Sequence, residues 1–265
     1  MVDTFISLWP SEREARAPSQ TGASNCGQTS VITSLMALKI NEDPCGEVTV
    51  RARNYGTRSL TAYLKSRALA GCTGADLVTG AASLSGGQAE AKFFATGTEP
   101  PEGLVDFLAD FISAGAAPVV TINTQLDGAD YWHHQAVLGV RRGSRTITLA
   151  NPVETVSEAE VARLLGSASV MLVMASDVLQ RCPPPAEEIE LLRAPQWAKF
   201  DVVGQVEKLM KMTAHDSHSH RIAIPASYVP GVTMIAPAGS GAARKVREAT
   251  SPWSDSQHDL ESWNK

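Results

Sequence analysis

The segment SQTGASNCGQTSVITSLMALKI, residues 19–40, places a cysteine at the point where a polar loop changes into an apolar helix. Apolar residues recur at helical spacing, so the segment predicts a helix over residues 25–40, with Ser24 or Asn25 as its N-cap. A cysteine that only filled the core would lie on the apolar stripe. Cys26 instead stands in the first turn, where backbone N–H groups have no partner within the helix.

A thiol in this position is suited to nucleophilic chemistry. The positive end of the helix dipole and the nearby N–H donors stabilise the thiolate, which is the form that attacks. The backbone N–H beside Cys26 can also stabilise an oxyanion on a substrate. Gln20, in the preceding loop, can supply a second donor, and Gly27 allows close approach beside the thiol.

Two histidines at the start of a predicted strand are candidate bases for this thiol. His133 and His134 begin HHQAVLGVRR, and alternation along a strand directs them to opposite faces of the sheet. SRTITLANP follows after a short turn, so the two segments predict an antiparallel hairpin. The end of its second strand returns beside the histidines, which brings Asn151 close to them. The side-chain oxygen of Asn151 can accept an imidazole N–H and fix the tautomer of the ring.

The remaining pattern predicts an α+β fold, with helices mainly in the first half and antiparallel strands in the second. Residues 80–88 are predicted to form a loop. The helix after the hairpin opens on a capping box formed by Ser157 and Glu160. Further helices are predicted over residues 57–71, 101–115, 155–167 and 201–212, and further strands over residues 90–97, 117–124 and 168–176.

Prolines indicate a domain boundary after Cys182. The segment CPPPAEE has three consecutive prolines, which fit neither a helix interior nor a central strand. We therefore expect one domain over residues 1–182 and a C-terminal extension over residues 183–236 with one helix. Residues 237–265 are small and polar, and we expect them to form a disordered tail.

Composition excludes several classes of partner. The chain has 265 residues and a formal net charge of −5, and no basic stripe with interleaved aromatic residues occurs. We therefore expect neither nucleic acid nor a membrane as a partner. The N-terminus has an early acid and lacks the pattern of a secretory signal, which predicts a cytoplasmic location, with export by a signal-independent route as the alternative.

The cysteines and histidines give little support for a metal or a cofactor, and we expect neither. The four cysteines are scattered without a CxxC pair, which predicts reduced thiols. His215, His218 and His220 in HDSHSH are the alternative metal-binding cluster, but a solvated polar loop is favoured because no further ligand is evident. The four cysteines are Cys26, Cys45, Cys72 and Cys182.

Taken together, these motifs resemble the papain-like cysteine peptidase superfamily. The resemblance is closest to the compact branch that contains the bacteriocin-processing (double-glycine leader) peptidases, and it spans about residues 18–180. In that branch a loop Gln precedes a Cys-Gly pair that opens the central helix, and a strand His precedes an Asp or Asn before Pro. His134 aligns with the family histidine better than His133 does. The matching residues are Gln20, Cys26-Gly27, His134 and Asn151-Pro152.

The resemblance implies a papain-like fold, with the nucleophile helix packed on an antiparallel sheet that contributes the His and the Asn. It implies a thiol hydrolase that cleaves a peptide or isopeptide bond of a peptide or protein substrate through a thioester intermediate. It implies that Cys26 is the nucleophile and His134 the base. Asn151 would then orient His134, and Gln20 would donate to the oxyanion. Two alternatives share the fold: an acyltransferase or transglutaminase-like enzyme, and a binding module that has lost catalysis.

Overall fold

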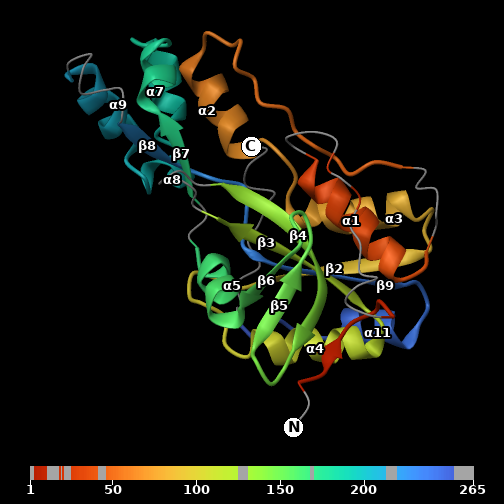
Figure 1. Cartoon of the computed structure of the whole chain (residues 1–265). Helices are drawn as coiled ribbons and strands as arrows, with labels where there is room; N and C mark the ends of the chain where they lie inside the picture. The colour runs from red at the N-terminus through yellow and green to blue at the C-terminus, as the bar shows by residue number, and fades with distance from the viewer. Residues whose placement is uncertain are drawn as a thin grey trace.

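The computed structural model describes residues 3–10, 18, 20, 25–40, 46–124, 131–167, 170–212 and 220–253. Within these ranges the fold is mixed α+β, with a seven-stranded antiparallel sheet and a separate two-stranded sheet (Figure 1). The strands are β1 (Phe5–Ile6), β2 (Ala89–Ala95), β3 (Ala117–Asn123), β4 (Trp132–Arg141), β5 (Thr146–Leu149), β6 (Glu154–Ser157), β7 (Val170–Met174), β8 (Arg221–Pro225) and β9 (Gly231–Pro237). The helices are α1 (Cys26–Ala37), α2 (Leu60–Leu69), α3 (Gly74–Leu84), α4 (Leu104–Ala114), α5 (Glu158–Leu165), α6 (Ala175–Leu179), α7 (Ala186–Leu191), α8 (Pro195–Ala198), α9 (Val202–Met210) and α11 (Gly241–Glu248).

The large sheet has the strand order β2-β9-β3-β4-β5-β6, and β1 pairs with β4. Alternation along the strands divides the core between its two faces. Val119 of β3 and Leu138 of β4 pack with α1 and α3 on one face. Val120 of β3 and Met234 of β9 pack with α4, α5 and α11 on the other. The sheet is therefore covered by helices on both sides, and α1 lies against β4 (Figure 1).

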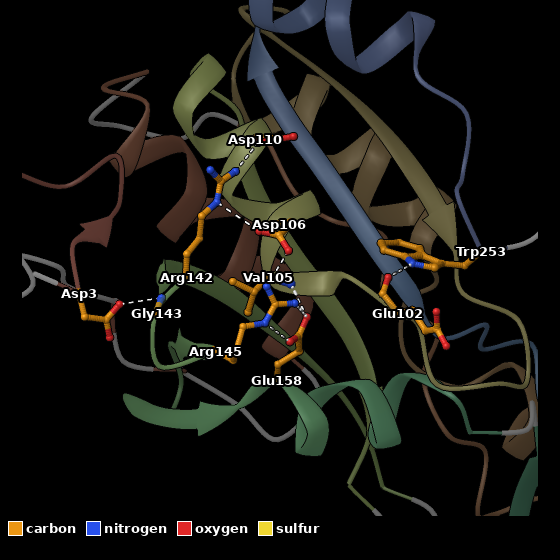
Figure 2. Close-up of polar contacts among 10 residues, drawn as sticks. All are labelled: Asp3, Glu102, Val105, Asp106, Asp110, Arg142, Gly143, Arg145, Glu158 and Trp253. Carbon is orange, nitrogen blue, oxygen red and sulfur yellow. Dashed lines mark hydrogen bonds and ion pairs between the residues drawn. The ribbon is translucent and has the colours of Figure 1, made fainter. Parts of the chain in front are cut away.

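The β4–β5 hairpin was predicted, and a polar network fastens its turn to the neighbouring helices (Figure 2). Arg145, the last residue of the turn, forms ion pairs with Glu158 of α5 and Asp106 of α4, each at 2.6 Å. Glu158 also accepts a hydrogen bond of 2.8 Å from the backbone N–H of Val105, in the first turn of α4. Arg142 pairs with Asp110 of α4. These contacts hold the hairpin in place, and with it the Asn151 turn at the end of β5.

The second sheet pairs β7 with β8, and its core lies beside the first. Trp197 is buried in the hydrophobic core of this second sheet. Trp132, the first residue of β4, packs into the same core with residues of α2, α6 and α9. The predicted strand over residues 168–176 is confirmed as β7, and the predicted helix over residues 201–212 as α9. The partner of β7, however, is β8, which comes from beyond the proposed domain boundary.

The expected division at residue 182 is wrong. Strand β9 lies inside the large sheet, paired with β2 on one side and β3 on the other. The described segments β8 and β9 are thus paired with strands from before residue 182 and do not form an extension to a completed domain. The predicted tail also contains α11, which buries Ala242, Ala243 and Val246, while residues 254–265 lie outside the described residues. The small residues of α11 allow this helix to pack closely against α4, although the composition of the segment suggested disorder.

The predicted loop over residues 80–88 is also wrong in its first half, because α3 continues to Leu84. Gly80 lies inside this helix, where a Cβ would come 2.6 Å from Cγ2 of Val48. The glycine therefore permits close packing and does not end the helix. Thr73 and Asp76 form a capping box at the start of α3. None of the helices in the described ranges combines the length and the apolar character needed to cross a membrane.

Candidate active site

Cys26 begins α1, as the sequence predicted, with Asn25 at the N-cap position. Ser24, the other predicted cap, lies outside the described residues. The Cys26 sulfur accepts hydrogen bonds from the main-chain N–H groups of Gly27 and His134. The start of α1 and the start of β4 thus both direct N–H donors at the thiol, and such donors stabilise a thiolate.

The imidazole paired with Cys26 belongs to His133. A side-chain hydrogen bond joins the Cys26 thiol to the His133 ring. Nε2 of His133 lies 2.8 Å from the main-chain carbonyl oxygen of Asn151. A carbonyl can only accept, so Nε2 is the protonated nitrogen, and Nδ1 is left for the thiol. Sulfur, imidazole and carbonyl therefore form a continuous hydrogen-bonded chain.

This pairing shifts both pKa values toward an ion pair. Burial opposes ionisation of Cys26, but the hydrogen bond and the charge of His133, with the N–H donors, hold the pKa of the thiol below its usual value. Burial likewise opposes a charged His133, but its bonds to Cys26 and to the Asn151 carbonyl raise the pKa of the imidazole above its usual value. A lowered thiol pKa beside a raised imidazole pKa shifts the pair toward thiolate and imidazolium.

The expectation that the His134 ring pairs with Cys26 is wrong. The residue is 1% exposed, and its Nε2 donates to the main-chain oxygen of Cys72 at 2.9 Å. The hydroxyl of Thr121 lies 3.0 Å from Nδ1 and donates to it. Burial lowers the pKa of His134 to about 4, so the ring is neutral near pH 7. His134 is a satisfied core histidine beneath α1.

Alternation along β4 explains why His133, and not His134, contacts the thiol. His134 points to the same face as Leu138, and α1 covers that face. The main-chain oxygen of His134 accepts a hydrogen bond of 2.9 Å from Ser30 of α1, which fixes the helix over the strand. His133 points the other way, and together with Tyr131 it lines the two pockets of this region.

Asn151 lies beside the histidines as predicted, but it holds the imidazole with its main chain. Its backbone φ is +67°, in the left-handed region that Asn tolerates better than most residues. Its carbonyl accepts from His133, and the Gln135 side chain lies 3.4 Å from the same oxygen. The expectation that the Asn151 side-chain oxygen orients the ring is therefore corrected. Nδ2 of Asn151 donates instead to Oε1 of Gln20 at 2.7 Å.

Gln20 and Cys26 line the same pocket, which has a volume of about 370 Å³. The Asn151 contact holds the carbonyl end of the Gln20 amide at the edge of this pocket. Gln20, Cys26 and Asn151 thus lie together, as the sequence predicted, but the histidine that joins them and the Asn151 atom that contacts it differ from the prediction.

One wall of this pocket was missed altogether. Tyr228, between β8 and β9, stacks on Trp132 with ring centroids 5.2 Å apart and donates to the main-chain oxygen of Ala70 at 2.6 Å. Its hydroxyl comes so close to Gly71 that a Cβ there would lie 1.6 Å from it. Gly71 also has a φ of +94°, so glycine is required twice over. No local motif marks Tyr228, because its neighbours come from distant parts of the chain.

Neither Cys72 nor Cys182 has a thiol activated in the way that the Cys26 thiol is. Cys72 lines the pocket, but burial raises the pKa of its thiol well above its usual value. Burial also raises the pKa of Cys182. Cys45, His215 and His218 lie outside the described residues. Within the described ranges, no three His, Cys, Asp or Glu side chains are grouped as metal ligands.

A second pocket of about 500 Å³ lies on the other side of His133. Its lining is mainly apolar, with Leu149 and Val161 among its residues, and Glu154 and Glu160 border it. His133 and Tyr131 line both pockets. The imidazole therefore stands between two hollows, and Cys26 opens into the smaller one.

The sequence was also compared with known proteins. No protein-family model matches the chain, and no curated protein matches it.

Proposed function

We propose that the chain is a papain-like thiol hydrolase that cleaves a peptide or isopeptide bond. The observation that supports it best is the chain of contacts from the Cys26 thiol through the His133 ring to the Asn151 carbonyl. This arrangement activates a nucleophile, supplies its acid and base, and fixes the tautomer of the base.

In the proposed mechanism, the Cys26 thiolate attacks the carbonyl carbon of the scissile bond. His133, protonated on Nδ1 and Nε2, gives its Nδ1 proton to the departing amine as the C–N bond breaks. A thioester between Cys26 and the acyl part remains. Neutral His133 then removes a proton from water, which attacks the thioester and releases the acid, and the thiolate and imidazolium return.

Two donors are proposed for the oxyanion that forms during both attacks. One is the backbone N–H of Cys26, at the start of α1. The other is the NH₂ group of Gln20, whose opposite end is held by Asn151 at 2.7 Å. Donors fixed before the reaction stabilise the developing charge without reorganisation.

Acyl transfer to an amine is a second candidate, favoured by one observation. The pocket beyond His133 is lined mainly by apolar side chains, which can seat an organic acceptor and limit the entry of water. A labelled amine added to a turnover reaction would separate the two: incorporation into the acyl product indicates transfer, and incorporation of oxygen from ¹⁸O-labelled water indicates hydrolysis. The proposed chemistry needs Cys26 as a free thiol, so a reducing compartment such as the cytoplasm suits it.

The first test is selective alkylation. Iodoacetamide near neutral pH should modify Cys26 faster than Cys72 or Cys182, because only the first of these thiols has a lowered pKa. Peptide mapping by mass spectrometry measures the three rates in one sample. Equal rates in the folded protein would refute an activated thiolate. A non-catalytic binding module is supported if Cys26 is activated but no acyl-enzyme forms with any member of a peptide library.

A further inference from the structure

The pocket that contains Cys26 has an unusual charge for this chain. Three arginines line it, Arg53, Arg67 and Arg221, against one carboxylate, that of Asp177. The Asp177 carboxylate already accepts a hydrogen bond of 2.7 Å from the hydroxyl of Tyr63. The whole chain has a formal net charge of −5, so this pocket is positive within an acidic protein. An anionic group is the natural complement of such a pocket.

Arg67, in the last turn of α2, gives the strongest indication. Within the described part of the chain its Nη1 is buried and has no hydrogen-bond partner. Its Nη2 lies 3.9 Å from the sulfur of Met171, a weak acceptor, and its guanidinium is 5.9 Å from the Tyr55 ring. A buried charged donor without an acceptor is unfavourable, and a ligand that supplies the acceptor removes this penalty.

Other arginines of the chain show the contrast. Each of three lies beside a carboxylate of the protein: Arg51 pairs with Asp76, Arg145 with Glu158, and Arg163 with Glu160. Arg53 donates to the hydroxyl of Tyr55 at 3.2 Å, which is a neutral partner. Arg53 and Arg67 at the Cys26 pocket thus contact neutral groups, a tyrosine hydroxyl and a thioether sulfur.

The position of the pocket relative to the two reacting groups assigns it to one side of the substrate. His133 protonates the leaving amine, so the leaving part lies against the ring, toward the apolar pocket that His133 borders and Cys26 does not. The acyl part stays on Cys26, in the pocket that Cys26 shares with Gln20 and the arginines.

We propose that this arginine pocket is a specificity subsite for an acidic side chain, Asp or Glu, on the acyl side of the scissile bond. The proposal rests on the thiol-hydrolase function above and names its substrate class. The planar fork of Arg67 matches the two oxygens of a carboxylate, and Arg53 adds charge at the mouth.

Two pairs of reagents test the subsite separately from the chemistry. Iodoacetate and iodoacetamide alkylate the same sulfur but differ in charge, so the ratio of their rates at Cys26 reports the local potential. The peptide electrophiles acetyl-Glu-Gly vinyl sulfone and acetyl-Gln-Gly vinyl sulfone differ only in the carboxylate. We expect both ratios to favour the anionic member relative to free cysteine at the same pH.

Variants then assign the effect to the arginines. Arg67→Gln should lower both ratios by about three- to tenfold, the size expected for removing one charge several ångströms away at partial screening. Arg67→Lys keeps the charge and should retain most of the iodoacetate ratio. Arg244→Gln, on the exposed surface of α11, is the matched control and should change neither ratio. Added salt should reduce the wild-type ratios.

The outcomes are distinguishable. If Arg67→Gln leaves both ratios unchanged in a folded protein, the acidic subsite is refuted, whatever the reactivity of Cys26. If Arg67→Gln does not fold, Arg53→Gln at the exposed mouth replaces it, and unchanged ratios there refute the proposal equally. Slow alkylation of Cys26 by neutral iodoacetamide counts instead against the proposed hydrolase, because that reagent does not sense the arginines.

Discussion

Replacement of His133 should raise the pKa of Cys26, and replacement of its neighbour His134 should not. His133→Asn removes a hydrogen bond and a positive charge from the thiolate. A hydrogen bond to a charged group contributes about 1.5–3 kcal/mol. At about 1.4 kcal/mol per pH unit, its loss raises the pKa of Cys26 by about one to two pH units. The N–H donors of Gly27 and His134 remain, which limits the rise.

The assay is the pH dependence of Cys26 alkylation by iodoacetamide, followed by mass spectrometry of the modified peptide. Below the pKa, the rate should fall roughly 10- to 100-fold in His133→Asn, in proportion to the thiolate fraction. At pH well above the pKa the two proteins should react alike, because both thiols are then ionised. This convergence distinguishes a change of pKa from a loss of access.

His134→Asn is the matched control, since it alters the adjacent residue of the same strand. The variant keeps the main-chain N–H that the Cys26 sulfur accepts, so the alkylation profile should move little. The free energy of unfolding should instead fall by roughly 2–4 kcal/mol, because the Thr121 hydroxyl and the Cys72 carbonyl lose their buried partner. Denaturant titration measures it. If His134→Asn shifts the Cys26 profile more than His133→Asn does, in proteins that are both folded, the assignment of the base is refuted.

Three further predictions concern stability and the Asn151 turn. His134 has a pKa of about 4 in the fold, below its ordinary 6.5, so the unfolded chain binds the proton first as the pH falls. The free energy of unfolding should therefore decline between pH 6.5 and pH 4 by up to about 3 kcal/mol. In His134→Gln the decline should be smaller by that amount, which urea titrations at each pH would measure. Asn151→Gly keeps the carbonyl that contacts His133 and tolerates the left-handed φ, but it removes the side chain that holds Gln20. The alkylation profile of Cys26 should therefore stay unchanged, while kcat on a cleaved peptide should fall by about tenfold or more. A raised pKa of Cys26 in this variant would contradict the reasoning. Met234→Ala, in central strand β9, should lower the free energy of unfolding by about 2–5 kcal/mol in a denaturant titration, whereas a change below about 1 kcal/mol would contradict the place of β9 in the core.

Local sequence patterns predicted the elements that bring the site together. Helical spacing identified α1 and α4, and β-branched runs identified β3 and the β4–β5 hairpin. In each case the signal lies within one segment, because amphipathic periodicity and turn residues are local properties. The proximity of Asn151 to the histidines followed from the antiparallel return of the hairpin, which needs no knowledge of the rest of the fold.

The place of β9 could not be predicted in this way. Its sequence has strand propensity, but its partners β2 and β3 lie far away in the chain, and no local feature reports such pairing. The prolines near residue 183 suggested a domain boundary, but strands after them pair with strands that precede them. A proline-rich turn and a domain boundary have the same composition, and only long-range contacts separate them.

The choice between two adjacent histidines shows why the motif alone was insufficient. Alternation states only that the two rings point to opposite faces of the sheet, and His134 was assigned as the partner of the thiol because it aligned better with the family histidine. Yet the ring that faces the helix is buried under it, beside Cys72 and Thr121, where it is neutral. The thiol stands at the end of the helix, so the ring that can reach it and also line the pockets is the one that faces away from the helix body. The same geometry explains Asn151. The imidazole of His133 contacts the main-chain carbonyl of Asn151 and does not need the side-chain oxygen. Residue 151 is constrained instead by its left-handed backbone and by the contact of its side chain with Gln20.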